Sequence, residues 1–133
     1  MSQPLARSDG PLRVLVVDAD DRVRESLTGL LAIGDRVLVV GSAGQAGPAL
    51  DPVADQRPDL VVVDPRLPEL DGGVAFIREL RARVPEIRIL AMSWSEATER
   101  AALECGADWF CRKTFRPTEL IAAITATCPR TDH

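Results

Sequence analysis

Short apolar runs rich in valine and isoleucine alternate along the chain with segments whose apolar residues recur every three or four positions. The short runs predict five strands, at residues 12–17, 36–41, 59–63, 87–92 and 108–111. The periodic segments predict helices at residues 21–34, 74–84, 95–106 and 117–128. Pro48 and Pro52 interrupt residues 45–57, which predicts only a short or kinked helix there.

Several of these strands are continuously apolar rather than alternating, which is typical of strands covered on both faces. Five strand–helix units of this kind predict an α/β fold, with a doubly wound parallel sheet between two layers of helices. Residues 41–47 (GSAGQAG) are interpreted as a turn, and residues 64–73 (DPRLPELDGG) as a loop. The helix residues expected to face the core are Val23, Leu27, Leu30, Leu31, Ile77, Leu80, Leu120, Ile121 and Ile124.

Composition narrows the classes of function. The 133 residues suit one domain, here placed at residues 12–128 between a flexible lead-in (1–11) and a short tail (129–133). The net charge of −4 does not favour nucleic-acid binding. No apolar run approaches the ~20 residues of a membrane span, and the N-terminus lacks the apolar core of a signal peptide, so we expect a cytoplasmic protein.

The cysteines and the histidine do not form a recognisable metal-binding or catalytic pattern. Cys105, Cys111 and Cys128 lack metal-type spacing, and we interpret them as idle thiols. His133 is the only histidine and the last residue, which argues against a histidine metal site or a Ser/His/Asp triad.

The candidate metal-binding and phosphoryl-transfer residues follow the ends of the predicted strands. In a doubly wound sheet, ligands bind at the carboxyl ends of the strands. The polar residues that follow the first, third, fourth and fifth strands are Asp18, Asp20, Asp21, Asp64, Ser93 and Lys113. Lys113 is the single lysine among 16 basic residues, which favours a site that needs a compact ammonium. Carboxylates grouped with an ammonium suit Mg²⁺ and phosphoryl transfer onto an aspartate.

Three segments carry a family resemblance: PDLVVVDPRLPELDGG (58–73), PEIRILAMS (85–93) and GADWFCRKTFRPTEL (106–120). They resemble the receiver domain of two-component response regulators, in the style of receivers that precede LuxR/NarL-type DNA-binding domains. The resemblance covers about residues 12–128 and implies a flavodoxin-like sheet with strand order 2-1-3-4-5. The roles it implies are phospho-acceptor for Asp64, Mg²⁺ ligands for Asp18, Asp64 and the Arg66 backbone carbonyl, loop proline for Pro68, and phosphoryl-contacting or switch residues for Ser93, Lys113 and Phe110.

The sequence departs from the family in two places. Ala19 stands where the family usually has a second acid that touches the metal, and this predicts weak Mg²⁺ binding. Asp20 is a minor candidate to replace that acid, although Asp20 and Asp21 fit better as an N-cap and a first-turn acid of the helix that follows. The connection after Ser93 is about two residues shorter than is usual, and Ser93 also fits a capping box with Glu96.

The resemblance implies a signalling domain rather than an enzyme. A sensor histidine kinase or phosphotransfer protein would phosphorylate Asp64, and the surface of residues 95–106, 108–111 and 117–128 would change its preference for an output domain, an output protein or a second copy of the chain. The alternative is an atypical receiver that binds proteins independently of phosphorylation because Ala19 impairs the metal site. An unrelated flavodoxin-like enzyme or flavin carrier on the same topology is a third hypothesis, and the acidic loop after the first strand disfavours a flavin phosphate there.

Overall fold

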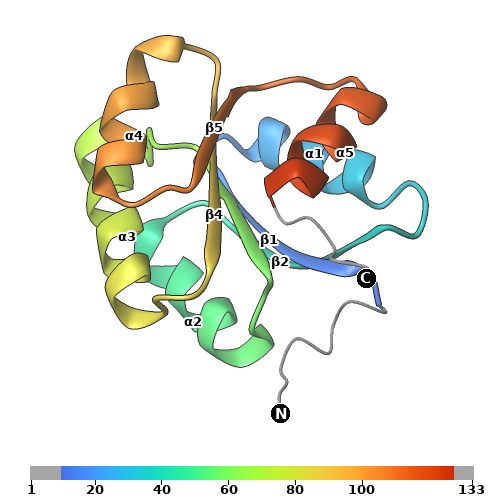
Figure 1. Ribbon diagram of the computed structural model, residues 1–133, viewed down its shortest axis with the longest axis horizontal. Coiled ribbons are helices and arrows are strands. Elements are labelled where there is room, and N and C mark those ends of the chain that lie inside the picture. Colours follow the sequence, from blue (N-terminus) through green and yellow to red (C-terminus); the bar gives the residue numbers. More distant parts are fainter. Residues whose placement is uncertain (1–9, 128–133) are drawn as a thin grey trace.

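The computed structural model describes residues 10–127 and has a five-stranded parallel sheet with helices on both faces (Figure 1). The strands are β1 (Leu12–Val17), β2 (Val37–Ala43), β3 (Leu60–Val63), β4 (Arg88–Ser93) and β5 (Trp109–Arg112). The helices are α1 (Asp21–Leu31), α2 (Ala46–Gln56), α3 (Leu70–Arg83), the 3₁₀ turn η2 (Glu96–Thr98), α4 (Glu99–Cys105) and α5 (Pro117–Thr127). The order β2-β1-β3-β4-β5 confirms the doubly wound fold class.

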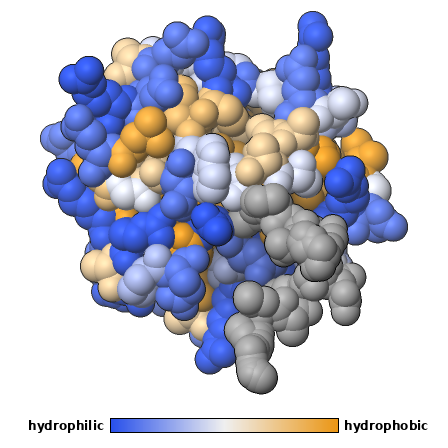
Figure 2. All heavy atoms as spheres, viewed as in Figure 1, coloured by the Kyte–Doolittle hydropathy of each residue, from blue (hydrophilic) through white to orange (hydrophobic). Residues whose placement is uncertain are grey.

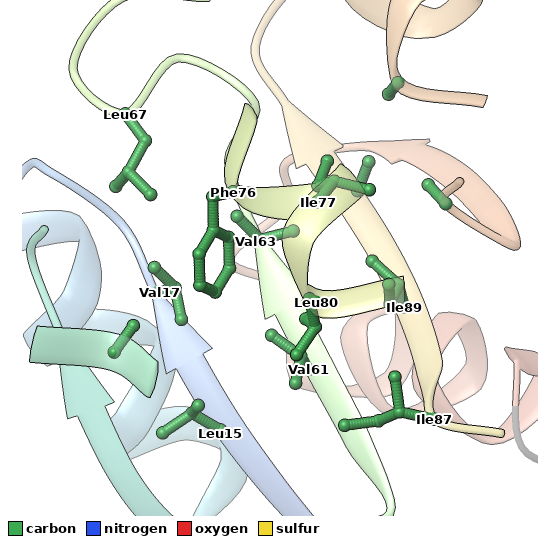
Figure 3. Packing of buried hydrophobic residues seen from close by; sticks show 14 of the residues in the cluster. Leu15, Val17, Val61, Val63, Leu67, Phe76, Ile77, Leu80, Ile87 and Ile89 are labelled. Atoms are coloured by element: carbon green, nitrogen blue, oxygen red, sulfur yellow. The ribbon is translucent and has the colours of Figure 1, made fainter. Parts of the chain in front are cut away.

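Two apolar layers explain why the strands are apolar on both faces. Helices α2, α3 and α4 cover one face of the sheet, and α1 and α5 cover the other (Figure 1). On the first face, Phe76, Ile77 and Leu80 of α3 pack against Val61 and Val63 of β3 (Figure 3). On the second face, α1 buries Val23, Leu27 and Leu31, and α5 buries Leu120 and Ile124. Leu30 and Ile121 are only partly buried.

Several element boundaries differ from the sequence prediction. Helix α3 begins at Leu70, inside the stretch expected to be a loop, and α2 is a full 11-residue helix with Pro52 inside it. Pro48 lies in the first turn of α2, where its missing N–H removes no helical hydrogen bond. The stretch expected to be a turn at 41–47 contributes instead to the end of β2 and the start of α2.

The helix expected over residues 95–106 is also different. It divides into the 3₁₀ turn η2 and the seven-residue α4. Ser95, rather than Ser93, caps this segment, because its side chain accepts a hydrogen bond from the Ala97 N–H at 3.1 Å. The lead-in up to residue 9, the tail and Cys128 lie outside the described residues, so the domain boundaries assigned from the sequence remain predictions.

The surface is mostly polar. Figure 2 shows hydrophilic side chains over much of one face, with hydrophobic residues among them. In the part of the chain that the structure describes, no helix is long and apolar enough to cross a membrane.

Close backbone contact explains where α3 begins. A Cβ atom on Gly73 would lie 1.6 Å from the Pro65 carbonyl oxygen, and one on Gly72 would lie 2.3 Å from the Leu67 oxygen. The Leu67–Pro68 peptide in the same loop is cis. Only glycine therefore lets the first turn of α3 pack against the loop that follows β3.

This contact leads to a prediction about two glycines. We expect Gly73→Ala to destabilise the fold by about 3 kcal/mol, because backbone must move to admit the methyl group. Gly29→Ala is the matched control, since Gly29 lies inside α1 with nothing within 4 Å of its Cβ position. It should stabilise the fold by about 0.5–1 kcal/mol. Urea unfolding measures both, and equal stability of the two variants would contradict the packing.

Candidate functional site

The strand ends bring two acids and the single lysine into contact. Asp18 follows β1 and Asp64 follows β3, and these two strands are neighbours in the sheet. The Lys113 Nζ atom lies 2.7 Å from Asp18 Oδ2 and 2.6 Å from Asp64 Oδ2. All three residues are buried, with exposed fractions of 3%, 8% and 8% for Asp18, Asp64 and Lys113. One ammonium therefore bridges two carboxylates, and the group has a net charge of −1.

Backbone N–H groups hold the other oxygen of each carboxylate. Asp18 Oδ1 accepts a hydrogen bond from the Asp20 N–H at 2.9 Å, and Asp64 Oδ1 accepts one from the Arg66 N–H at 2.8 Å. The loops after β1 and β3 thus wrap around their own acids. This arrangement fixes the direction in which each carboxylate points.

Asp20 and Asp21 belong to the helix that follows. The Asp20 side chain accepts hydrogen bonds from the N–H groups of Arg22 at 2.9 Å and Val23 at 3.2 Å, which confirms the N-cap interpretation. Asp21 lies in the first turn of α1 and pairs with Arg24 at 2.5 Å. Asp20 is exposed and its Oδ1 atom caps the helix N-terminus, while its role as a substitute metal ligand stays a prediction.

Ser93 and Phe110 lie on the two strands nearest the lysine. Ser93 ends β4 and is buried, its Oγ accepts a hydrogen bond from the Ser95 N–H at 3.3 Å, and its carbonyl accepts one from the Lys113 N–H at 2.9 Å. Phe110 lies in β5, partly buried against the apolar cluster under α3 and α4. Ser93 is therefore at the same edge as the acids, whereas Phe110 packs against the core.

Three further residues shape the site without having been predicted from the sequence. Arg24 donates to the Asp18 carbonyl oxygen at 2.7 Å and so fixes the loop after β1. The Trp94 ring centroid lies 5.4 Å from Lys113 Nζ, and the Phe115 ring contacts Trp94. Their positions in the sequence could have indicated the two aromatic residues, because Trp94 directly follows Ser93 and Phe115 comes two residues after Lys113.

Cys105 and Cys111 are the cysteines within the described residues, and both are free thiols. Burial raises the pKa of Cys105 more than nearby Arg78 and a backbone hydrogen bond lower it, and burial also raises the pKa of Cys111. Both stay protonated near neutral pH and are poor nucleophiles. This agrees with their interpretation as idle thiols.

The carboxylates of Asp18 and Asp64 suit a hard metal cation that takes only a few of its ligands from the protein. Asp18 and Asp64 supply two carboxylates, each with an oxygen lone pair beyond its present contacts. Across residues 10–127, no three His, Cys, Asp or Glu side chains are grouped as a metal site. Mg²⁺ commonly takes one or two carboxylates and keeps its remaining ligands as water. The set therefore suits Mg²⁺ with one acid fewer than the family pattern, because Ala19 packs against the apolar cluster instead.

The fold and this edge define a doubly wound α/β domain with a buried acid–lysine site. The response regulator receiver domain family matches residues 14–125, and the chain belongs to that family. It is therefore the receiver domain of a two-component response regulator, a signalling family rather than a family of catalytic enzymes.

Individual relatives agree with this assignment. The response regulator MprA of Mycolicibacterium vanbaalenii is 39% identical over 123 residues, which cover 91% of this chain and 52% of that protein. The NarL receiver domain of Mycobacterium tuberculosis superposes with a TM-score of 0.78 at 28% identity, covering 88% of this chain and 95% of that one. A LuxR-family response regulator from Aurantimonas superposes with a TM-score of 0.77 at 33% identity, covering 87% of this chain and 84% of that one. The chain spans about half the length of the curated relatives it matches.

The bridging ammonium leads to a stability prediction. We expect Lys113→Met to destabilise the fold by about 3 kcal/mol, because it leaves two buried carboxylates without a cation. In an Asp64→Asn background the same substitution should cost clearly less, since only one carboxylate then remains. Urea unfolding of the four proteins in this double-mutant cycle gives the coupling. Equal costs in both backgrounds would mean that Nζ and Asp64 do not interact.

Proposed function

We propose that this receiver accepts a phosphoryl group on Asp64 from a sensor histidine kinase or a phosphotransfer protein. The observation that carries the proposal is the Lys113 ammonium, which lies 2.6 Å from Asp64 Oδ2 at the carboxyl edge of the sheet. A buried carboxylate beside a fixed cation is suited to attack a phosphorus atom and to tolerate the charge that develops there.

The transfer can be written for the residues of this chain. An Asp64 carboxylate oxygen forms a bond to phosphorus while the bond from phosphorus to the donor breaks, and the electron pair leaves with the donor. Lys113 would neutralise a phosphoryl oxygen, and the Ser93 hydroxyl would donate a hydrogen bond to another. Asp18, Asp64 and the Arg66 carbonyl would hold Mg²⁺, which when bound neutralises charge on the transferring group.

A local charge change at this edge would then alter the surface of the domain. The phosphoryl group adds negative charge where Lys113 now pairs with Asp18 and Asp64. Ser93 ends β4, and Lys113 follows β5. Movement of these two residues would therefore shift α4, β5, α5 and Phe110. We propose this α4–β5–α5 surface as the one that contacts an output domain, an output protein or a second copy of the chain.

The first test is phosphorylation by a small donor. With Mg²⁺ and acetyl phosphate, we expect the intact mass to increase by one phosphoryl group, and Asp64→Asn to abolish the adduct. Asp71→Asn is the matched control, because Asp71 is an exposed acid in the first turn of α3. It should take up phosphate like the unsubstituted protein. An unmodified mass for the unsubstituted protein would refute the proposal.

A second candidate function is protein binding that does not depend on phosphorylation. Ala19 favours it, because the side chain at this position packs against the apolar cluster and leaves the site with two acids. This hypothesis requires that Asp64→Asn leaves partner binding in cells unchanged. The proposed phospho-accepting function requires that the same substitution removes the response.

A substitution at Ala19 tests whether this residue weakens Mg²⁺ binding, as the sequence predicts. We expect Ala19→Asp to tighten Mg²⁺ binding roughly tenfold, because it adds a third carboxylate. Titration of Mg²⁺ against tryptophan fluorescence measures the change. Ala19→Asn is the control of matched shape without the charge, and it should change affinity far less. If both variants bind like the unsubstituted protein, residue 19 does not limit metal affinity.

A further inference from the structure

The guanidinium of Arg24 lies where two loops meet at the carboxyl edge of the sheet. Arg24 belongs to α1, and its Nη1 atom donates a hydrogen bond to the Asp18 carbonyl oxygen at 2.7 Å. The connection between β2 and α2 packs against the same nitrogen, because a Cβ atom on Gly44 would lie 2.6 Å from Nη1 and 3.6 Å from the Asp18 oxygen. The absence of a side chain at Gly44 therefore leaves the space that the guanidinium occupies.

The contact with Arg24 completes a set of four that hold Asp18. The Asp18 N–H donates to the Ala43 carbonyl oxygen at 3.0 Å, Oδ1 accepts from the Asp20 N–H, and Oδ2 contacts Lys113. Arg24 holds the remaining polar atom, the carbonyl oxygen. Because a peptide group is planar, fixing this oxygen fixes the direction in which the chain leaves Asp18. It thereby helps to place the Asp20 N–H that aims the Asp18 carboxylate.

The other end of the guanidinium is also held. Its Nη2 atom pairs with Asp21 Oδ1 at 2.5 Å, and the Arg24 side chain is 20% exposed. Asp21 is 79% exposed, so the pair adds little energy, but it gives the planar fork a second fixed contact. The arginine is therefore oriented by an acid of the helix start and by the backbone of Asp18.

We propose that Arg24 is a positioning residue that aims Asp18 at Mg²⁺, and that Gly44 seats its guanidinium. The inference deepens the proposed function and rests on it, because Mg²⁺ held by Asp18 would assist transfer to Asp64. The site has two carboxylates, since Ala19 supplies none, so the direction of each one counts for more. Arg24 touches neither Mg²⁺ nor the phosphoryl group in this proposal and acts through the Asp18 peptide alone.

The sign of the effect separates positioning from charge. Arg24 is a cation close to an acidic site, so by charge alone its removal should tighten the binding of another cation. Positioning predicts the opposite, because a misdirected Asp18 carboxylate binds Mg²⁺ less well. Loss of a group that orients a metal ligand commonly weakens metal binding by about tenfold or more.

The first experiment is a titration of Mg²⁺ against tryptophan fluorescence. Arg24→Ala should weaken binding about tenfold, and Arg24→Lys, which keeps the charge and one donor, should recover part of the loss. Arg22→Ala is the matched control, because Arg22 is an exposed arginine in the first turn of the same helix and its loss changes the charge equally. It should leave the affinity unchanged or slightly tighter. Arg24→Ala binding as tightly as Arg22→Ala would overturn the proposal.

A substitution at Gly44 displaces the guanidinium without removing it. We expect Gly44→Ala to weaken Mg²⁺ binding several-fold, because its methyl group would overlap Nη1, and to have little further effect in the Arg24→Ala background. Gly47→Ala is the control, since nothing lies within 4 Å of its Cβ position, and it should bind like the unsubstituted protein. An equal effect of Gly44→Ala in both backgrounds would mean that Gly44 does not act through Arg24.

A measurement on the metal-free protein makes the test independent of Mg²⁺ and of phosphorylation. By NMR, the Asp20 amide proton should exchange with solvent several-fold faster in Arg24→Ala than in Arg22→Ala. The amide of Leu15, in the middle of β1, should exchange equally slowly in both, which shows that the fold is intact. Unchanged exchange at Asp20 would overturn the role of Arg24. If the unsubstituted protein takes up no phosphate, the proposed function fails, while Asp20 exchange and Mg²⁺ affinity still decide whether Arg24 positions Asp18.

Discussion

The site depends on one cation held between two buried carboxylates. Asp18 and Asp64 follow adjacent parallel strands, and their like charges would repel at this depth without a partner. Lys113 follows β5, beyond β4, and its long stem brings a compact ammonium to both acids. An arginine guanidinium is a planar fork, whereas the lysine ammonium is a compact point charge that here contacts two separate oxygens. The single lysine of the chain thus lies where a compact cation contacts two acids.

This ion group also organises the loops around it. Asp18 and Asp64 each use one oxygen for Lys113 and the other for a backbone N–H of their own loop. The loop after β1 continues into the Asp20 cap of α1, and Arg24 of α1 donates back to the Asp18 carbonyl. The start of α1 and the geometry of the site are therefore parts of the same hydrogen-bonded structure.

Sequence patterns predicted the strands and the site edge well, because continuous apolar runs and the ends of parallel strands are local signals. They failed where tertiary contact decides the outcome. The start of α3 at Leu70 depends on the approach of Gly73 to Pro65, which no periodicity records. The division of residues 96–105 into η2 and α4 likewise depends on the Ser95 cap. The contact between Trp94 and Phe115 joins residues on different strands' loops, and only the three-dimensional arrangement reveals it.

Two residues that neighbour site residues in the sequence, Ala19 after Asp18 and Trp94 after Ser93, differ in how the scaffold uses them. Ala19 packs against the apolar cluster, so the fold makes no use of a carboxylate at that position. Trp94 is half exposed, so its bulk is not needed to fill the core either. One residue lowers the negative charge available to a cation, and the other adds an apolar ring beside Lys113. Because neither a carboxylate at position 19 nor the bulk of Trp94 is needed for packing, substitution at these positions should leave the acid–lysine group and the sheet the same.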